Sequence, residues 1–153
     1  MSKNSSTMSP VIRKATADDL ESICRIEQEG QGRWSRIQFA DELKLNFSRV
    51  YVIEDGGAVI GFAVAWIVAD EIQLNNIGIK KEFRRRGLGT LIMNKIIMHP
   101  DDAGPRKKIY LEVSAQNKPA ILFYRNNGFI EMGRRKNYYD SIDAILMERE
   151  LRT

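Results

Sequence analysis

The sequence predicts an α/β (α+β) fold in which a mixed sheet of about seven strands has helices on both faces. The composition fits one core-forming domain, because 43% of the 153 residues are hydrophobic and 29% are charged. Short apolar runs of strand length alternate with apolar residues at helical spacing. The expected order is β-α-α-β-β-β-α-β-α-β-β, and it predicts the layered sheet.

Capping residues mark the two helices expected in the first half of the chain. Thr16 with Asp19 and Ser35 with Gln38 have the spacing of a capping box, in the first pair its acidic variant. We expect these helices to extend to about residues 30 and 45. A hairpin signal follows at residues 55–57, which are Asp-Gly-Gly. Strands are expected at residues 11–14, 49–54, 58–68 and 72–79.

The second half predicts two further helices, at residues 88–98 and 117–127. Pro119 stands in the first turn of the second helix, where proline is tolerated, and Gly128 suits the left-handed position that ends it. Residues 99–105 form a helix breaker, and a strand is expected at 107–113. The last two strands are expected at 129–132 and 142–149, joined by a polar loop that contains Arg134, Arg135, Tyr138 and Tyr139.

A basic segment with two glycines stands between a predicted strand and a predicted helix. Arg84, Gly87 and Gly89 form an Arg-x-x-Gly-x-Gly pattern. The first turn of a helix has unpaired N–H groups and partial positive charge, and glycine allows the backbone to approach a phosphate. The Walker pattern is missing, and Ile92 replaces the third glycine of the dinucleotide fingerprint. The segment predicts a phosphorylated cofactor of another type, although a glycine-capped basic turn without a ligand has the same pattern.

Two side chains can supply acid–base chemistry. Glu112 interrupts an otherwise apolar strand, and Tyr124 lies on the helix that follows it. Such a carboxylate is a candidate general base, and a neighbouring tyrosine hydroxyl is a candidate general acid. From the residues alone, Glu112 fits a solvated strand face equally well, and core packing is the commoner role for a residue such as Tyr124.

Other features exclude several classes of protein. The single cysteine, Cys24, excludes an internal disulfide and suits a reducing compartment. No apolar run approaches the ~20 residues of a membrane helix, and the polar, serine-rich start has no signal-peptide pattern. The lone histidine, His99, indicates no metal cluster. We expect a cytoplasmic protein with a disordered tail over residues 1–9 and a single domain over residues 10–153.

Together these segments resemble the GCN5-related N-acetyltransferase (GNAT) superfamily, which binds acetyl-CoA. Residues 76–89 resemble its strand and cofactor loop, and residues 111–124 resemble its catalytic strand and helix. Glu27, Trp34 and residues 134–139 are similar to segments of the bacterial ribosomal-protein alanine N-acetyltransferases. The resemblance covers nearly the whole chain.

Two departures from that branch concern the acceptor side. Arg33 stands before Trp34 where the branch often has proline, and Asp140 and Ser141 follow the tyrosine pair where a proline is often found. The departures affect the expected peptide preference and leave the expected cofactor unchanged.

The resemblance implies a mostly antiparallel sheet and direct acetyl transfer without a metal. Glu112 would take the proton of the acceptor amine, and Tyr124 would protonate the departing thiolate. Asn117 would contact the cofactor, or would serve only as a helix N-cap. By similarity, the acetyl-CoA contacts are Ile77, Gly78, Ile79, Arg84, Arg85, Arg86, Gly87, Leu88, Gly89, Thr90 and Asn117. The acceptor contacts would be Trp34, Tyr138 and Tyr139, for each of which loop packing is an equal alternative.

The implied acceptor is a protein N-terminus, with a ribosomal-protein alanine first among the candidates. An α-amine, with a pKa near ~8, is partly neutral in the cytosol, whereas a lysine amine, near ~10.4, needs a stronger base arrangement. A lysine side chain or a small-molecule amine remains the alternative. A non-catalytic CoA sensor or RNA-binding module fits less well, because Glu112 and Tyr124 are both present. We expect no membrane partner and no direct nucleic-acid binding.

Overall fold

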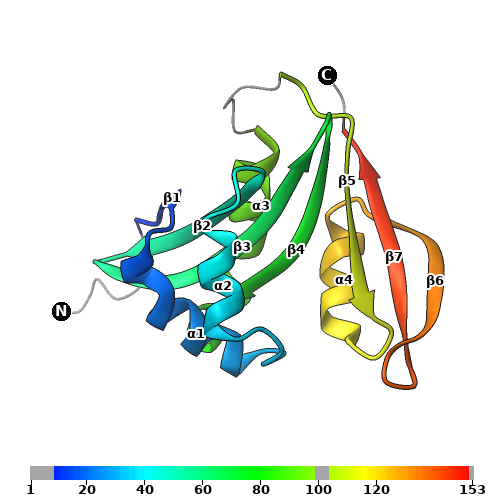
Figure 1. Cartoon of the computed structure of the whole chain (residues 1–153), viewed down its shortest axis with the longest axis horizontal. Coiled ribbons are helices and arrows are strands. Elements are labelled where there is room, and N and C mark those ends of the chain that lie inside the picture. Colours follow the sequence, from blue (N-terminus) through cyan, green and yellow to red (C-terminus); the bar gives the residue numbers. More distant parts are fainter. Residues whose placement is uncertain (1–8, 99–103, 152–153) are drawn as a thin grey trace. The chain divides into compact units, whose positions relative to one another are not determined.

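A computed structural model of the chain describes residues 9–98 and 104–151, and Figure 1 shows their arrangement into strands and helices. The predicted order of the strands and α-helices is confirmed, with two short 3-10 helices in addition. The elements are β1 (Val11–Lys14), η2 (Ala17–Asp19), α1 (Leu20–Glu29), α2 (Arg36–Glu42), β2 (Ser48–Asp55), β3 (Ala58–Val68), β4 (Glu71–Ile79), η3 (Lys81–Phe83), α3 (Leu88–Met98), β5 (Lys108–Ser114), α4 (Lys118–Asn126), β6 (Ile130–Tyr139) and β7 (Ile142–Glu150).

The strands form a sheet in the order β1-β2-β3-β4-β5-β7-β6. β1 with β2, β5 with β7, and β7 with β6 are antiparallel pairs. β4 and β5 are parallel, and residues 71–73 pair with residues 108–110. A parallel pair needs a long crossover connection, and α3 lies within this one. The predicted fold class, a mixed and mostly antiparallel sheet with helices, is therefore confirmed.

The chain divides into two compact units. The first contains the described residues up to Ala65 together with Asn76–Met98, and so includes α1, α2, α3 and the end of β4. The second contains Trp66–Asn75 and the described residues from Gly104 onward, and so includes β5, β6, β7 and α4. The single domain over residues 10–153 stays a prediction. Most of the expected tail and of the helix breaker, with His99, lies outside the described residues.

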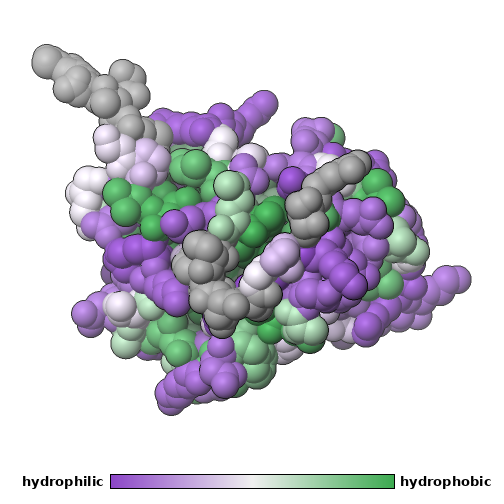
Figure 2. Space-filling model, turned by 90° about the horizontal axis from the view of Figure 1, so that it is seen from above, coloured by the Kyte–Doolittle hydropathy of each residue, from purple (hydrophilic) through white to green (hydrophobic). Residues whose placement is uncertain are grey.

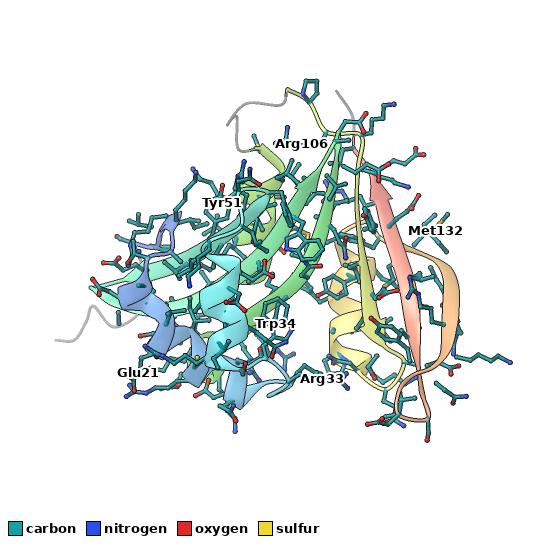
Figure 3. All side chains as sticks on the ribbon, in the orientation of Figure 1. Glu21, Arg33, Trp34, Tyr51, Arg106 and Met132 are labelled. Carbon is teal, nitrogen blue, oxygen red and sulfur yellow. The ribbon has the colours of Figure 1, made fainter. Side chains whose placement is uncertain are left out.

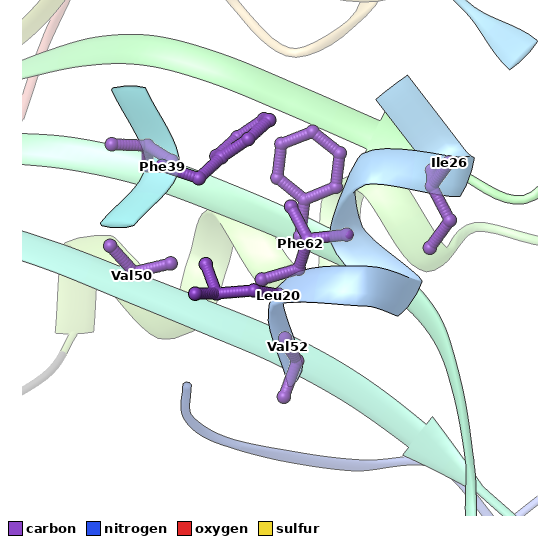
Figure 4. Packing of buried hydrophobic residues seen from close by; sticks show 8 residues of the cluster. Leu20, Ile26, Phe39, Val50, Val52 and Phe62 are labelled. Carbon is purple, nitrogen blue, oxygen red and sulfur yellow. The ribbon is translucent and has the colours of Figure 1, made fainter. Parts of the chain in front are cut away.

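The hydrophobic core of the first unit lies between its helices and its strands. The apolar residues of α1 recur at helical spacing and therefore share one face, which packs on β2 and β3 together with Phe39 of α2. Figure 4 shows this packing, in which the rings of Phe39 and Phe62 meet edge to face at 5.3 Å. The buried members of the cluster are Leu20, Ile23, Ile26, Phe39, Val50, Val52, Phe62 and Val64.

Both predicted capping boxes are present. Thr16 and Asp19 form the first, and Asp19 also accepts two hydrogen bonds from Arg13, at 2.8 and 2.9 Å. Ser35 accepts a hydrogen bond from the Gln38 backbone N–H at 3.2 Å and opens α2. The prediction that this second helix extends to residue 45 was wrong, because α2 ends at Glu42.

The predicted loop at residues 133–139 is a strand. β6 extends to Tyr139, where it pairs with Ile142 of β7 across a two-residue turn. Asp140 and Ser141 form this turn with φ angles of +41° and +64°. Left-handed turn residues are usually glycine or asparagine, so a turn without either was not recognised.

On the face seen in Figure 2, hydrophilic side chains separate patches of hydrophobic surface. Exposed large hydrophobic residues include Ile37 of α2, Met98 of α3 and Leu122 of α4. Among the described helices, none has the length and apolar content needed to cross a membrane.

Candidate active site

The predicted phosphate loop is a left-handed turn that leads directly into a helix. After β4 and η3 the chain is extended at Arg84, and then Arg85 and Gly87 adopt φ angles of +66° and +80°. A Cβ atom built on Gly87 would meet no atom within 4 Å, so this side of the turn is open. The N–H groups of the first turn of α3 point back towards the loop, which is the arrangement that binds a phosphate.

The three arginines of this loop are exposed and have different contacts. Arg84 donates from Nε to the Ile79 carbonyl oxygen at 2.9 Å, and so braces the loop against the end of β4. The guanidinium of Arg86 lies over the Phe83 ring, 5.2 Å from its centroid. Arg85 adopts the left-handed backbone conformation. For a residue with a Cβ atom, this conformation is about 1 kcal/mol less favourable than the right-handed one.

The predicted cofactor strand, at Ile77, Gly78 and Ile79, forms the end of β4. A Cβ atom on Gly78 would lie 2.6 Å from Cε1 of Phe62 and 3.2 Å from Cγ2 of Ile26. Because this space is already filled by the core, Gly78 has a packing reason to be glycine. Its role beside a cofactor stays a prediction.

Glu112 lies in the middle of β5, where buried and half-buried residues alternate. Its side chain is 22% exposed, and Nε of Arg135 lies 2.8 Å from Oε2. The contact is an ion pair without hydrogen-bond alignment, and Oε2 is buried with no hydrogen-bond partner among the described residues. The Arg135 guanidinium also lies over the Tyr138 ring, at 5.4 Å. The segment expected to be a loop therefore supplies a strand residue that meets the candidate base.

Tyr124 and Asn117 both belong to the α4 region. Tyr124 is buried, and its ring lies 5.3 Å from that of Phe123 and 5.5 Å from that of Phe129. Asn117 is the N-cap of α4, and its Oδ1 accepts a hydrogen bond from the Ala120 N–H at 3.3 Å. Tyr124 therefore packs in the core and Asn117 caps the helix, as the alternative structural interpretations predicted. The catalytic role of Tyr124 and the cofactor contact of Asn117 stay predictions.

The three candidate acceptor residues differ in their surroundings. Trp34 is half-buried, and its ring lies 5.1 Å from that of Phe39. Tyr138 of β6 is 49% exposed. The side chain of Tyr139 lies outside the described part of the structure.

Glu27 of α1 was matched to the family but given no role. It is 4% exposed, and Oε2 accepts hydrogen bonds from the N–H groups of Arg33 and Trp34, each at 3.0 Å. Oε1 accepts a third, from Nδ2 of Asn76, at 3.1 Å. The sequence did contain a signal, because Glu27 lies seven residues after Leu20 and therefore on the apolar face of the helix.

The candidates thus form two groups, one in each unit. In the first unit, Glu27 joins the segment of Trp34 to β4, which leads to the phosphate loop. In the second, Glu112 meets Arg135, whose guanidinium lies over the Tyr138 ring, while Asn117 caps the helix that carries Tyr124. Within the described residues, no cluster of three His, Cys, Asp or Glu residues could hold a metal ion.

Comparison with known proteins gives consistent matches. Residues 16–129 match the sequence model of the acetyltransferase (GNAT) family. The ribosomal protein bS18-alanine N-acetyltransferase of Escherichia coli K12 is 34% identical over 137 residues, which are 87% of this chain and 89% of that protein. The crystal structure of the E. coli ribosomal-protein-S18-alanine N-acetyltransferase superposes with a TM-score of 0.84 at 29% identity, covering 95% and 96% of the two chains. Ard1 from Thermoplasma volcanium gives a TM-score of 0.85 at 27% identity, covering 94% and 99%.

Proposed function

The chain belongs to the acetyltransferase (GNAT) family, and we propose that it acetylates the N-terminal α-amine of a protein, with a ribosomal-protein alanine as acceptor. The observation that carries the choice of acceptor is the 34% identity, over 87% of the chain, to an enzyme named for that reaction. The ion-paired Glu112 on β5 supports the proposed chemistry, because the reaction needs a group that accepts a proton.

The loop before α3 fits the phosphates of acetyl-CoA. Its open side at Gly87 leaves room for an anion against the backbone, and the helix N-terminus favours negative charge. Arg85 and Arg86 would add charge-assisted contacts. In the second unit, Oδ1 of Asn117 is used by the helix cap, so Nδ2 would be the donor towards the cosubstrate. Bound acetyl-CoA supplies an acetyl group activated as a thioester.

Two side chains would move protons in this proposal. Glu112 accepts the proton that the acceptor nitrogen loses as its bond to the acetyl carbon forms. The Tyr124 hydroxyl donates a proton to the sulfur as the carbon–sulfur bond breaks. An α-amine suits this arrangement, because its pKa near ~8 leaves a sizeable neutral fraction at neutral pH.

A free-thiol release assay with a panel of short peptides tests the proposal. The panel has Ala-first, Ser-first and Met-first peptides with free N-termini, and N-blocked peptides that contain lysine. We expect thiol release with free N-termini only, and the fastest release with alanine first. Release with only the lysine peptides would contradict the proposed acceptor, and release with no peptide would favour a small-molecule amine.

A further inference from the structure

Glu27 is a buried carboxylate at the end of α1 that no step of the proposed reaction uses. Placing a charged group in the interior is costly unless hydrogen bonds compensate for the lost water. The three hydrogen bonds to Glu27 do so, and their donors are two backbone N–H groups and one side-chain amide. All of these groups belong to the same compact unit.

These donors come from two separate parts of the chain. Arg33 and Trp34 belong to the segment between α1 and α2, and Asn76 belongs to β4, directly before Ile77. Figure 3 shows Arg33 and Trp34 on this connecting segment. The Trp34 ring is held on one side by Phe39, so Glu27 and Phe39 together fix both its backbone and its ring.

We propose that Glu27 is a positioning residue for the acceptor peptide. It holds the backbone at Arg33 and Trp34 against Asn76 of β4, and so keeps the Trp34 ring in the place where the peptide binds. This inference rests on the proposed function, in which Trp34 contacts the acceptor. Glu27 would thus act on peptide binding through Trp34, without touching the peptide or acetyl-CoA itself.

Replacing Glu27 with glutamine tests the role with almost no change in volume. A carboxylate has two accepting oxygens, whereas an amide has one oxygen and one NH₂ donor. In Glu27→Gln, the new NH₂ group therefore points either at the Asn76 amide donor or at the backbone N–H groups of Arg33 and Trp34, so that two donors face each other. The charge-assisted contact between the segment and β4 is lost, and a neutral hydrogen bond replaces it at best, if the Asn76 amide turns to accept from the new NH₂ group. The apolar packing of α1 remains.

Glu21 on the same helix provides the matched control. Glu21→Gln makes the same chemical change, but Glu21 is 70% exposed and pairs with Arg25 at 3.1 Å. Figure 3 shows Glu21 on the outer side of α1, away from Trp34. General effects of losing a negative charge from this helix should appear in both variants.

The first measurement is steady-state kinetics with an Ala-first peptide, below the melting temperature of every variant. For Glu27→Gln we expect KM for the peptide to rise about tenfold, with kcat and the acetyl-CoA dissociation constant within about twofold of the unmodified protein. Glu21→Gln should match the unmodified protein. A purely structural role would lower the melting temperature and the active fraction and leave KM unchanged, and that result would overturn the inference.

The second measurement does not depend on activity. The chain has two tryptophans, so a Trp66→Phe background leaves the fluorescence of Trp34 alone. Acrylamide should quench Trp34 more strongly in Glu27→Gln than in Glu21→Gln, because the released segment exposes the ring. Equal quenching would overturn the inference. If the unmodified protein acetylates no peptide, the proposed function fails, and the quenching comparison still decides whether Glu27 fixes this segment.

Discussion

At the scale of single residues, the surroundings of Glu112 distinguish it from an ordinary strand carboxylate. One of its oxygens is buried, and the guanidinium of Arg135 lies 2.8 Å from that oxygen. Arg135 is 58% exposed, whereas the Glu112 side chain is only 22% exposed. The proposed role of Glu112 as base requires this guanidinium to turn away towards solvent when the acceptor amine binds.

Glu112→Gln removes the proposed base and keeps the shape of the side chain. We expect kcat to fall about a hundredfold or more, with acetyl-CoA affinity nearly unchanged, because the proposal assigns the cosubstrate contacts to other residues. Steady-state kinetics and calorimetry measure the two effects. Glu131→Gln is the control, since it removes a carboxylate from β6 that pairs with Arg134 at 3.3 Å. An unchanged rate across pH would remove Glu112 as the base.

Tyr124→Phe deletes only the hydroxyl and keeps the ring contacts with Phe123 and Phe129. If the hydroxyl protonates the leaving sulfur, transfer should slow about a hundredfold, and the protein should remain folded by circular dichroism. Phe123→Leu is a packing control on the same helix. Full activity of Tyr124→Phe would leave this tyrosine with its packing role alone.

At the scale of elements, local signals predicted most of the fold. The capping boxes at Thr16 and Ser35 mark helix starts through hydrogen bonds between side chains and backbone N–H groups three residues apart, and the glycines at 56 and 57 mark a turn through their left-handed backbone. β6 was missed because its pairing with β7 depends on distant residues and on a turn at Asp140 and Ser141 without glycine. Asp140 and Ser141, the two residues that depart from the family branch after the tyrosine pair, thus form a tight hairpin turn.

Asp19 links this capping to the pH dependence of stability. Its hydrogen bonds with Arg13 hold the pKa of the Asp19 carboxyl below its ordinary value. The stabilisation is therefore complete above the unfolded pKa, about 4, and is lost as pH falls through the lower folded pKa.

Asp19→Asn should cost about 1 kcal/mol of unfolding free energy at neutral pH, because it removes the ion pair with Arg13 and leaves one accepting oxygen where Thr16 and Arg13 used two. Urea unfolding at a series of pH values measures this difference, which should shrink towards zero in acid. Asp18→Asn, in the same turn and exposed, is the control. A difference that stayed constant down to strongly acidic pH would contradict the role given to Arg13.

The phosphate loop has a matched control in the β2–β3 hairpin. Gly87 and Gly57 have φ angles of +80° and +85°, and a Cβ atom on either would meet nothing within 4 Å. Gly87→Glu and Gly57→Glu should therefore carry the same strain, about 1 kcal/mol. Only Gly87→Glu should abolish acetyl-CoA binding in a calorimeter, because the carboxylate would intrude where the proposal places the phosphates. Tight binding by that variant would show that the loop has another role.

At the scale of the whole molecule, the sequence predicted candidate roles for single residues but not the contacts between distant ones. The loop at Gly87 and the pair Glu112 and Tyr124 stand in short recognisable segments, so their candidate roles could be assigned before the fold was known. The contacts of Glu27 with Asn76 and of Glu112 with Arg135 join residues far apart in the chain. No local pattern predicts such contacts, so the sequence alone could not place Asn76 beside Glu27 or Arg135 beside Glu112.

The measurement that tests the central claim most directly uses one peptide with a free N-terminal alanine and an internal lysine. The two amines compete for acetyl transfer within a single molecule, and tandem mass spectrometry locates the added group. We predict acetylation of the α-amine alone in the unmodified protein. Acetyl on the lysine, with the α-amine unmodified, would contradict the account.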